Sequence, residues 1–430
     1  MKRRDFIRSV GAASAALALP LSISACGSST PAGNGKVTIN WWHISTQDPG
    51  KTDFQNMANQ YMQAHKNVTV KISIIDNTDF KTKLQAKLQA NDPPDIFQSW
   101  GGGVLQQYVK AGQVQEITSA LQQNGWGDSF SKAALDLYSF DGKNYGVPWD
   151  AGAVGFWYNP DLFTKAGIAQ PPATWDDLLA SIPKLKAIGV TPMALGEKDT
   201  WTGHFYWVYL AVRLGGKAAF DKAYSRSGSF ADPPFVQAGQ MLQQLNALKP
   251  FENGFLGADY GTHQALIGNG KAAMELMGQW APVNDAAASV DKRGKTLAFF
   301  PFPAVPGGAG DPGDVMGGGN GFAIGKNAPP ETVDFVRFLT NATNESLLAK
   351  HAVAVPPVKG AGDAVVDQMK PIVQLLANAK YYQLYYDQYL PQTLATTILE
   401  QTQALYAGTA TPQAAAQAIE ATASTALQAQ

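Results

Sequence analysis

The sequence predicts an α/β protein built from two lobes. From residue 36 onward the spacing of apolar residues switches repeatedly between a period of two and a period of 3.6, which indicates strands that alternate with helices. The alternation occurs in two successive blocks, and apolar residues make up 45% of the 430 residues, which is ample for proper cores. Alternation of this kind favours a largely parallel sheet.

The first block contains elements of both kinds. Val37, Ile39 and Trp41 alternate with polar residues as in a strand, and helical spacing follows behind the capping candidates Thr52 and Asp53. The next elements are expected at residues 68–74 (strand), 80–88 (helix) and 95–97 (strand). Ligands of open α/β sheets bind beyond the carboxyl ends of strands. The segments in which we expect a site are residues 43–47, 99–103 and 149–152.

A second block begins near Val154 and again mixes both periods. Its helices are expected at residues 175–188, 204–214 and 235–248, its strands at 193–195, 271–277, 297–300 and 317–324, and further helices from 331 to the end. Extended segments near residues 148–156 and 300–303 would serve as crossovers between the lobes. The expected division is residues 36–148 and 304–328 for lobe 1, and 149–303 and 329–430 for lobe 2.

The first 25 residues have the pattern of a secretory signal peptide. Four basic side chains within residues 2–8 precede an apolar run at 10–25, which is shorter than the roughly 20 residues that span a bilayer. Residues 3–7 (RRDFI) resemble the twin-arginine export signature, and residues 23–26 (ISAC) resemble a bacterial lipobox. We therefore expect residues 1–25 to be removed.

Cys26 is the only cysteine of the chain, and the lipobox would make it the lipidated first residue. Residues 26–35 would then form a flexible tether. No later apolar run reaches 18 residues, so we expect the lipid to be the only membrane attachment. The protein is expected to be exported and anchored on the outer face of the bacterial cytoplasmic membrane.

Charge and motifs exclude several classes of protein. A formal charge of −1 and 16% charged residues argue against a nucleic-acid binder. A GxGxxG match at residues 308–313 lies in a proline-rich loop rather than between a strand and a helix, so it predicts no dinucleotide site. HExxH and GxSxG do not occur, and the five histidines lack metal-ligand spacing. We therefore expect no cofactor and no metal.

Tryptophans at predicted strand ends carry the strongest signal for a site. Trp100 follows the strand at 95–97 and precedes three glycines, Trp149 lies at the expected crossover, and Trp280 follows the strand at 271–277. A tryptophan is most often part of a core, but these positions put a flat ring where a cleft should lie. Sugars stack apolar C–H faces on such rings and offer hydroxyls at the rim.

Polar side chains near these rings would bind the hydroxyls. Carboxylates, amides and imidazoles can do so, and each charge-assisted hydrogen bond contributes on the order of 1.5 to 3 kcal/mol. The candidates are His43, Asp150, Glu197, His204 and Asn320. For His43 an equally weighted alternative is a structural histidine in its strand, and His204 could simply begin its helix.

Several motifs occur together in a characteristic order. They are the lipoprotein leader, Trp41-Trp42, DPPDIF (92–97), YGVPW (145–149), WYNPDLF (157–163), TWDDL (174–178) and MELMGQW (274–280). In this order and spacing the chain resembles the family 1 extracellular sugar-binding proteins of bacterial ABC importers, over almost all of residues 36–410.

The resemblance implies a type II-like periplasmic-binding-protein fold, in which two lobes close on a carbohydrate in the cleft between them. It implies a site that includes Trp100, Glu197, Trp201, His204, Trp280 and Asn320, with Tyr385 from a late aromatic cluster. Where the family often has a carboxylate after the VPW-like turn, this chain has Gly152, with Asp150 two residues earlier. The implied partners are a mono- or small oligosaccharide and the permease subunits, and we expect a monomer without catalytic residues.

A secreted glycoside hydrolase or lyase that uses the same aromatic cleft remains the alternative. Its paired carboxylates could come from Asp150, Glu197, Asp199 or Glu275, because the sequence does not measure the separation that such chemistry requires. A binding protein would leave the sugar unchanged, whereas an enzyme would turn it over.

Overall fold

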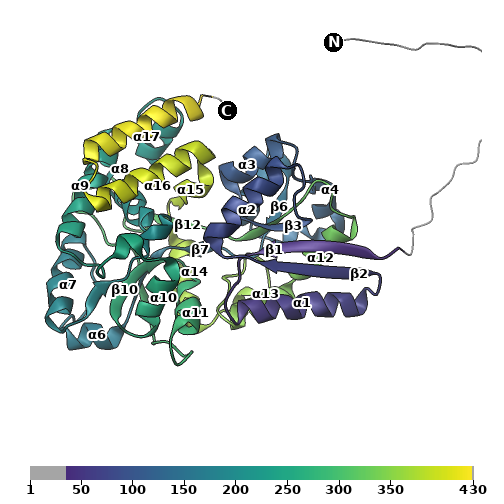
Figure 1. Cartoon of the computed structure of the whole chain (residues 1–430), viewed down its shortest axis with the longest axis horizontal. Helices are drawn as coiled ribbons and strands as arrows, with labels where there is room; N and C mark the ends of the chain where they lie inside the picture. Colours follow the sequence, from purple (N-terminus) through teal and green to yellow (C-terminus); the bar gives the residue numbers. More distant parts are fainter. Residues whose placement is uncertain (1–34, 429–430) are drawn as a thin grey trace, which may run out of the picture. The chain divides into compact units, whose positions relative to one another are not determined.

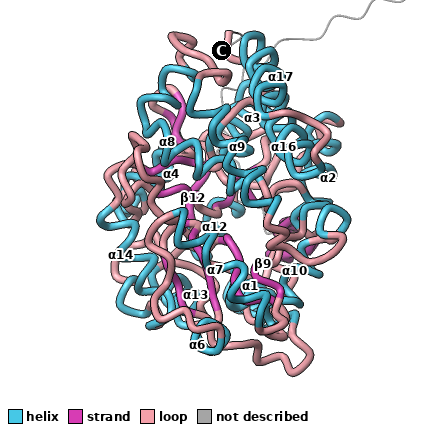
Figure 2. Tube along the Cα trace, turned by 90° about the vertical axis from the view of Figure 1, so that its left-hand side faces the viewer, coloured by secondary structure: helices cyan, strands magenta, loops and turns pink. Residues whose placement is uncertain are grey.

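The computed structural model describes residues 35–428, of which residues 36 onward belong to one compact unit (Figure 1). The expected signal peptide, Cys26 and all of the tether except Gly35 lie outside the described residues. Strands occupy the interior of this unit, and helices and loops surround them (Figure 2). None of the helices within residues 35–428 has both the length and the apolarity needed to cross a membrane.

Lobe 1 is a five-stranded sheet between two layers of helices. In spatial order its strands are β2 (Val68–Ile74), β1 (Val37–His43), β3 (Ile96–Ser99), β13 (Gly321–Ile324) and β6 (Gly146–Pro148). The first three are parallel, and β13 runs antiparallel to both of its neighbours. A small hairpin, β4 (Ser139–Phe140) with β5 (Lys143–Asn144), lies outside this sheet.

The helices of lobe 1 divide between the two faces of its sheet. One face packs against α1 (Gly50–Ala64), α12 (Glu331–Leu339) and α13 (Ala342–Lys350) around Trp41, Phe54 and Phe335. The other packs against α2 (Asn77–Gln89) and α3 (Gly102–Lys110) around Phe80 and Phe97. The short helices α4 (Thr118–Leu121) and α5 (Lys132–Asp136) lie in the connection to β6. Alternate strand residues thus reach separate cores, as the period of two predicts.

Lobe 2 is built on a mixed four-stranded sheet. Its spatial order is β11 (Ala298–Phe300), β8 (Gly155–Tyr158), β10 (Ala272–Met277) and β9 (Thr191–Met193). Only β9 and β10 are parallel. The helices of this half are α6 (Pro160–Lys165), α7 (Trp175–Ala187), α8 (His204–Tyr224), α9 (Pro233–Ala247), α10 (Tyr260–Gly268), α11 (Ala281–Ala288), α14 (Lys370–Asn378), α15 (Tyr386–Tyr389), α16 (Gln392–Ala407) and α17 (Pro412–Ala426).

A two-stranded ribbon connects the lobes. After β6 pairs with β13 in lobe 1, the same two segments continue as β7 (Gly152–Ala153) and β12 (Val315–Gly318), which pair again beside β14 (Tyr382–Leu384). A third segment crosses after α13, where Ala151 N donates to Val355 O at 2.9 Å. The lobes are therefore joined by several hydrogen-bonded segments rather than by a single linker.

The division between the lobes differs from the expected one at two places. Residues 331–350 form α12 and α13, which pack on α1 and so belong to lobe 1 instead of lobe 2. The crossover expected near residues 300–303 lies at 318–320, because β11 pairs with β8 inside lobe 2 and the chain leaves that lobe only after β12. Packing between segments that are far apart in the sequence decides both the lobe of residues 331–350 and the position of the crossover.

Arg213 on α8 holds the loop that precedes β12. Its guanidinium is buried and donates five hydrogen bonds of 2.7–3.2 Å, to the backbone carbonyls of Phe302, Pro303, Asp311, Pro312 and Asp314. It also lies over the rings of Tyr209 and Phe302. One side chain thus replaces the regular backbone pairing that residues 302–314 lack.

We expect Arg213→Leu to lower the free energy of unfolding by at least about 3 kcal/mol, because several buried carbonyls lose their donor at once. Urea unfolding followed by tryptophan fluorescence measures the loss. Lys217→Leu on the same helix is the control: it removes an exposed ion pair with Asp221, which is worth about 1 kcal/mol or less. Equal losses in the two variants would contradict this role of Arg213.

Candidate functional site

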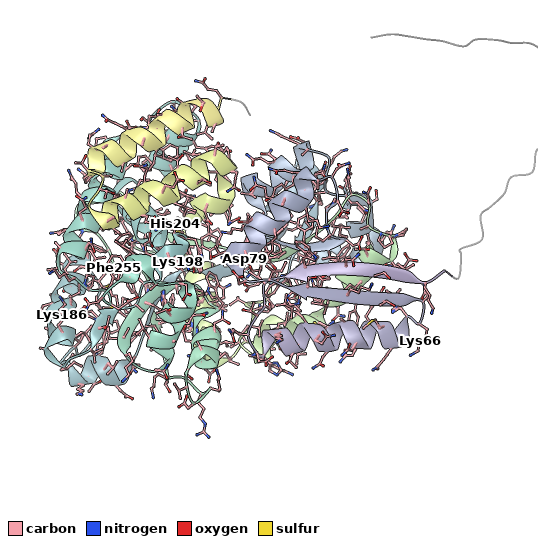
Figure 3. The ribbon with its side chains drawn as sticks, viewed as in Figure 1. Lys66, Asp79, Lys186, Lys198, His204 and Phe255 are labelled. Atoms are coloured by element: carbon pink, nitrogen blue, oxygen red, sulfur yellow. The ribbon has the colours of Figure 1, made fainter. Side chains whose placement is uncertain are left out.

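A cavity of about 610 Å³ lies between the lobes, within the range of sites for small molecules. Lobe 1 lines it with the segments that follow the carboxyl ends of its parallel strands: residues 44–47 after β1, 76–79 after β2 and Trp100 after β3. From lobe 2, Trp280 follows β10 in the same way. Asp79 and Lys198 lie near the boundary between the lobes, whereas Lys66 and Lys186 lie at opposite outer ends (Figure 3).

Six of the ten residues predicted from the sequence line this cavity. They are Trp100, Trp149, Trp201, Trp280, Asn320 and Tyr385. The structure brings them together from the segments after β3 and β10, the segment before α8, the interlobe ribbon and the segment before α15. The other four, His43, Asp150, Glu197 and His204, do not line it, and each is at most 1% exposed.

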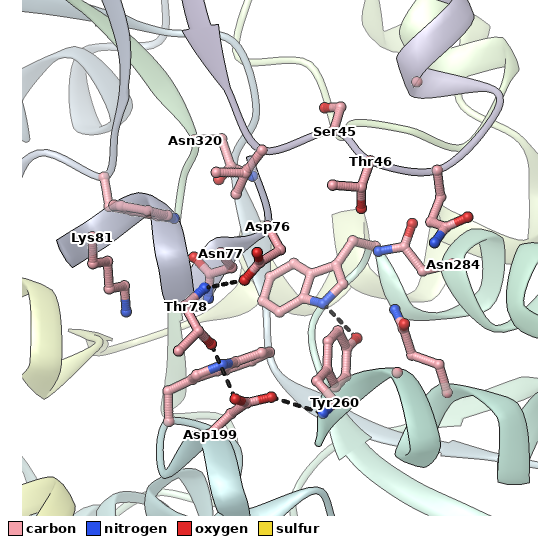
Figure 4. Close-up of a pocket in the computed structure, with 18 of the residues that line it drawn as sticks. Ser45, Thr46, Asp76, Asn77, Thr78, Lys81, Asp199, Tyr260, Asn284 and Asn320 are labelled. Atoms are coloured by element: carbon pink, nitrogen blue, oxygen red, sulfur yellow. Dashed lines mark hydrogen bonds between the residues drawn. The ribbon is translucent and has the colours of Figure 1, made fainter. Parts of the chain in front are cut away.

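Aromatic rings form the lobe 2 wall. Trp280 Nε1 donates to Tyr260 Oη at 3.0 Å, which fixes the plane of the indole (Figure 4). Trp201 packs edge-on against Tyr260, with 4.8 Å between the ring centroids. Trp201 Nε1 is buried and has no hydrogen-bond partner among the described residues. This wall offers apolar faces with a few polar atoms at their edges.

Polar groups from both lobes meet at the beginning of α2. Asp76 caps this helix by accepting from Thr78 N and Asp79 N at 3.1 and 3.0 Å. Thr78 Oγ1 donates to Asp199 Oδ1 at 3.1 Å, and Asp199 Oδ2 accepts from Tyr260 N at 2.7 Å (Figure 4). One carboxylate thus joins the polar rim of lobe 1 to the aromatic wall of lobe 2.

An ion pair makes a second contact between the lobes. Lys81 Nζ lies 3.0 Å from Asp387 Oδ2. Burial opposes ionisation of Asp387, but Lys81 and the neighbouring His204 outweigh it and lower the pKa of this carboxyl. The charged side chains that line the cavity are Asp76, Asp79, Asp199, Asp259, Asp387, Lys81 and Lys198. Carboxylates therefore predominate, and they accept hydrogen bonds as hydroxyl-bearing ligands require.

His43 and His204 support the cavity from behind. Burial lowers the pKa of His43 to about 3, so the ring is neutral, and its Nδ1 accepts from Ser45 N at 3.2 Å. His204 Nδ1 donates to Trp201 O at 2.6 Å, and burial lowers its pKa as well. His43 thereby orders the loop after β1, and His204 orders the backbone of Trp201. Burial raises the pKa of Glu197, which lies beneath the same loop, well above its usual range.

Asp150 lies where the connecting segments meet. Its Oδ1 accepts from Val355 N at 2.9 Å, and its Oδ2 accepts from Asn320 Nδ2 at 2.7 Å and from Gln279 Nε2. Asn320 Oδ1 in turn accepts from Gln98 Nε2 of β3 at 2.7 Å. A hydrogen-bonded chain therefore runs from the lobe 1 sheet through the ribbon to lobe 2. Burial raises the pKa of Asp150 to about 6 even though these donors favour the ionised form.

Some lining residues were not predicted from the sequence. Asp76 and Thr78 follow the carboxyl end of β2, so their position after a strand is the sequence signal that marks them. The sequence indicates Asp199 only as one of the candidate carboxylates of the alternative hydrolase. Tyr260 begins α10 after a loop, so no strand end marks it in the sequence.

Comparison with known proteins gives one family for most of the chain. Residues 46–346 match the model of the bacterial extracellular solute-binding protein family. An uncharacterized ABC transporter extracellular-binding protein of Pyrococcus horikoshii is 29% identical over 292 residues, which is 62% of each chain. The chain thus spans less than two thirds of the length of this curated relative.

Two solved structures are similar over nearly their whole length. A protein studied for xylan utilization in Caldanaerobius polysaccharolyticus superposes with a TM-score of 0.84 at 30% identity, covering 90% of this chain and 99% of that one. A chitin oligosaccharide binding protein gives a TM-score of 0.84 at 26% identity, covering 92% and 100%. The two-lobe α/β fold expected from the sequence is therefore confirmed.

The raised pKa of Asp150 predicts a pH dependence of stability. The folded state holds this proton more tightly than the unfolded chain, so the stabilisation is fully present below pH 3.8 and is lost as the pH rises through about 6. Between pH 4.5 and 7.5 we expect the wild type to lose about 2 kcal/mol relative to Asp150→Asn, since groups common to both variants cancel. Chemical denaturation at several pH values measures the difference.

Asp367→Asn is the matched control for this experiment. Asp367 is an exposed carboxylate whose pKa is lowered by Lys370, so its removal cannot reproduce a loss of stability with rising pH. A difference between wild type and Asp150→Asn that does not change from pH 4.5 to 7.5 would show that Asp150 does not titrate as its burial requires.

Proposed function

The chain belongs to the family of bacterial extracellular solute-binding proteins, and from this we propose that it captures a mono- or small oligosaccharide outside the cytoplasmic membrane and delivers it to the permease of an ABC importer. The observation that carries the proposal is the cavity itself. Indole rings from both lobes lie beside carboxylates and an amide within one space of about 610 Å³. Rings bind the apolar faces of a sugar, and the polar groups bind its hydroxyls.

The relatives support a carbohydrate as the ligand. One structural relative is a chitin oligosaccharide binding protein, and another comes from work on xylan utilization. A multiple sugar-binding protein of Streptococcus mutans is 24% identical over 332 residues. The chitin oligosaccharide and multiple sugar relatives are named as binding proteins, and the comparisons give no support to the alternative of a hydrolase or lyase.

Closure of the lobes on the ligand is part of the proposal. The contacts Thr78–Asp199 and Lys81–Asp387 already join the lobes across the cavity. A sugar held by both walls binds the closed state more tightly than an open one, and this difference in affinity is what shifts a population toward closure. The ribbon of β6–β7 and β12–β13 is the segment that would bend.

We also propose that the mature protein is a monomer anchored by lipid on Cys26, after export and removal of residues 1–25. Lipobox spacing in residues 23–26 and the family's extracellular character support this location. The tether of residues 26–35 would leave the lobes free to reach the permease.

A sugar screen with a variant of Trp280 tests the function. The panel is xylose and N-acetylglucosamine with their β-1,4-linked oligomers up to five residues, and a ligand at 100 times its Kd stabilises the protein by about 2.7 kcal/mol, visible as a rise in Tm. Trp280→Ala should weaken binding of the best sugar by roughly thirtyfold or more in calorimetry, because it removes a stacking face worth at least about 2 kcal/mol.

Trp280→Phe is the matched control, since it keeps a six-membered ring face and loses the pyrrole ring with the N–H that donates to Tyr260. It should retain most of the affinity. Wild-type affinity in Trp280→Ala would place the sugar elsewhere. Conversion of the bound sugar into products would contradict a binding protein.

Replacement of the proposed lipid attachment site tests the anchor. Cys26→Ser should release the exported protein into the soluble fraction while sugar binding stays unchanged, because the thiol is the only one in the chain that lipid could modify. Membrane fractionation of cells that express the variant measures the release. Ser28→Ala, two residues away, should stay in the membrane fraction. Quantitative retention of Cys26→Ser in that fraction would contradict the lipid anchor.

A further inference from the structure

A second cavity lies directly beside the first. It measures about 260 Å³ and is bounded by α2, β3 and α3 on one side and by α15 and α16 on the other. The residues that line both cavities are Lys81, Trp100, Asp387 and Gln388. The two cavities therefore share one partition, made of an indole, an ion pair and an amide.

The Lys81–Asp387 ion pair is the charged part of this partition. Lys81 Nζ lies 5.3 Å from the Trp100 ring and 3.0 Å from Asp387 Oδ2, and its side chain is 34% exposed. Because Asp387 is buried, breaking this pair costs more than breaking a pair between two exposed side chains, unless another donor takes the place of Lys81. When Lys81 turns toward solvent, Asp387 still accepts from Gln388 Nε2 at 2.8 Å, so the buried carboxylate is not left without a donor. A ligand hydroxyl that donates to Asp387 in place of Lys81 would lie between the two cavities.

The walls of the second cavity repeat the chemistry of the first. Trp100 and Tyr108 contribute rings, and Leu84, Val104 and Leu399 contribute apolar surface. Amide side chains from both lobes lie among them: Gln85, Gln98, Gln388 and Gln392. Burial raises the pKa of Tyr108 to about 12, so its hydroxyl stays protonated and can donate.

Gln98 supplies an acceptor with no partner in the protein. Its side chain is 1% exposed, its Nε2 donates to Asn320, and its Oε1 has no hydrogen-bond donor among the described residues. An unsatisfied buried amide oxygen destabilises the folded protein, and a ligand hydroxyl that donates to it would remove that cost. The same side chain thereby connects the second cavity to the Asn320–Asp150 network at the ribbon.

We propose that the second cavity is the end subsite for a linear oligosaccharide whose other residues occupy the main cavity, so that the chain of sugars passes along Trp100. This inference rests on the proposed function and names its ligand class: an oligomer long enough to extend beyond the main cavity. Shorter sugars fill the main cavity alone and leave the Lys81–Asp387 ion pair intact.

A pair of tryptophan substitutions on α16 tests the subsite. Thr396 is exposed and lines the second cavity only, whereas Thr393, also exposed and on the same helix, lines neither cavity. In the wild type, calorimetry on the mono- to pentasaccharide panel should show affinity that rises by at least tenfold once the oligomer exceeds the length that fills the main cavity. Thr396→Trp should abolish this rise and leave the Kd of the shorter sugars unchanged, while Thr393→Trp should behave as wild type.

The outcomes separate this inference from the proposed function. If short sugars bind but length brings no gain in the wild type, or if Thr396→Trp keeps the gain, the subsite is wrong and the function stands. If no sugar of the panel binds the wild type, both fail. Equal Tm values of the two unliganded variants show that a loss of the gain does not come from unfolding.

Discussion

The hydrogen bonds to the carboxylate of Asp150 determine how the two lobes meet. A buried carboxylate is tolerated only when donors surround it, and the donors here come from Val355 and Asn320 of two connecting segments and from Gln279 of lobe 2. The side chain cannot keep all three if one segment moves away from the others. The connecting segments therefore behave as one unit. This unit sets the angle between the two lobes, and that angle determines the geometry of the cavity.

The walls of the cavity follow from the strands that end beside this unit. In lobe 1 the loops after β1, β2 and β3 present hydroxyl, amide and carboxylate groups, with the cap of α2 holding Asp76 in place. In lobe 2 the rings of Trp201, Tyr260 and Trp280 order one another by edge contacts and one hydrogen bond. Each wall is thus preorganised by its own lobe, and contact between the walls needs only the pairs Thr78–Asp199 and Lys81–Asp387.

The spacing of apolar residues in the sequence predicted the site residues whose position depends on a single neighbouring strand. Trp100 and Trp280 could be found because each directly follows a strand whose spacing is visible in the sequence, and such ends converge on one edge of a sheet. The crossover at 318–320 could not, because it depends on β13 pairing with both β3 and β6. Likewise nothing in the sequence of residues 331–350 indicates that they pack on α1. The hydrogen bond between Tyr61 and Glu331, for example, joins residues that are 270 positions apart in the chain. Burial separated Asp150, His43, Glu197 and His204 from the cavity surface, and burial is a property of the assembled fold.

The distribution of carboxyl groups explains why the cavity suits retention of a ligand rather than its cleavage. General acid catalysis on a glycosidic bond needs a carboxyl whose pKa is raised at the surface that touches the sugar. Here burial raises the pKa of Asp150 and Glu197, which lie behind that surface, whereas Asp387 at the surface has its pKa lowered by Lys81 and His204 against the effect of burial. Asp76 and Asp199, which also line the cavity, accept backbone N–H groups that fix their orientation. The surface therefore presents oriented acceptors beside aromatic rings, and with the proposed sugar ligand these groups would hold hydroxyls in place without supplying a proton to the bond between sugars.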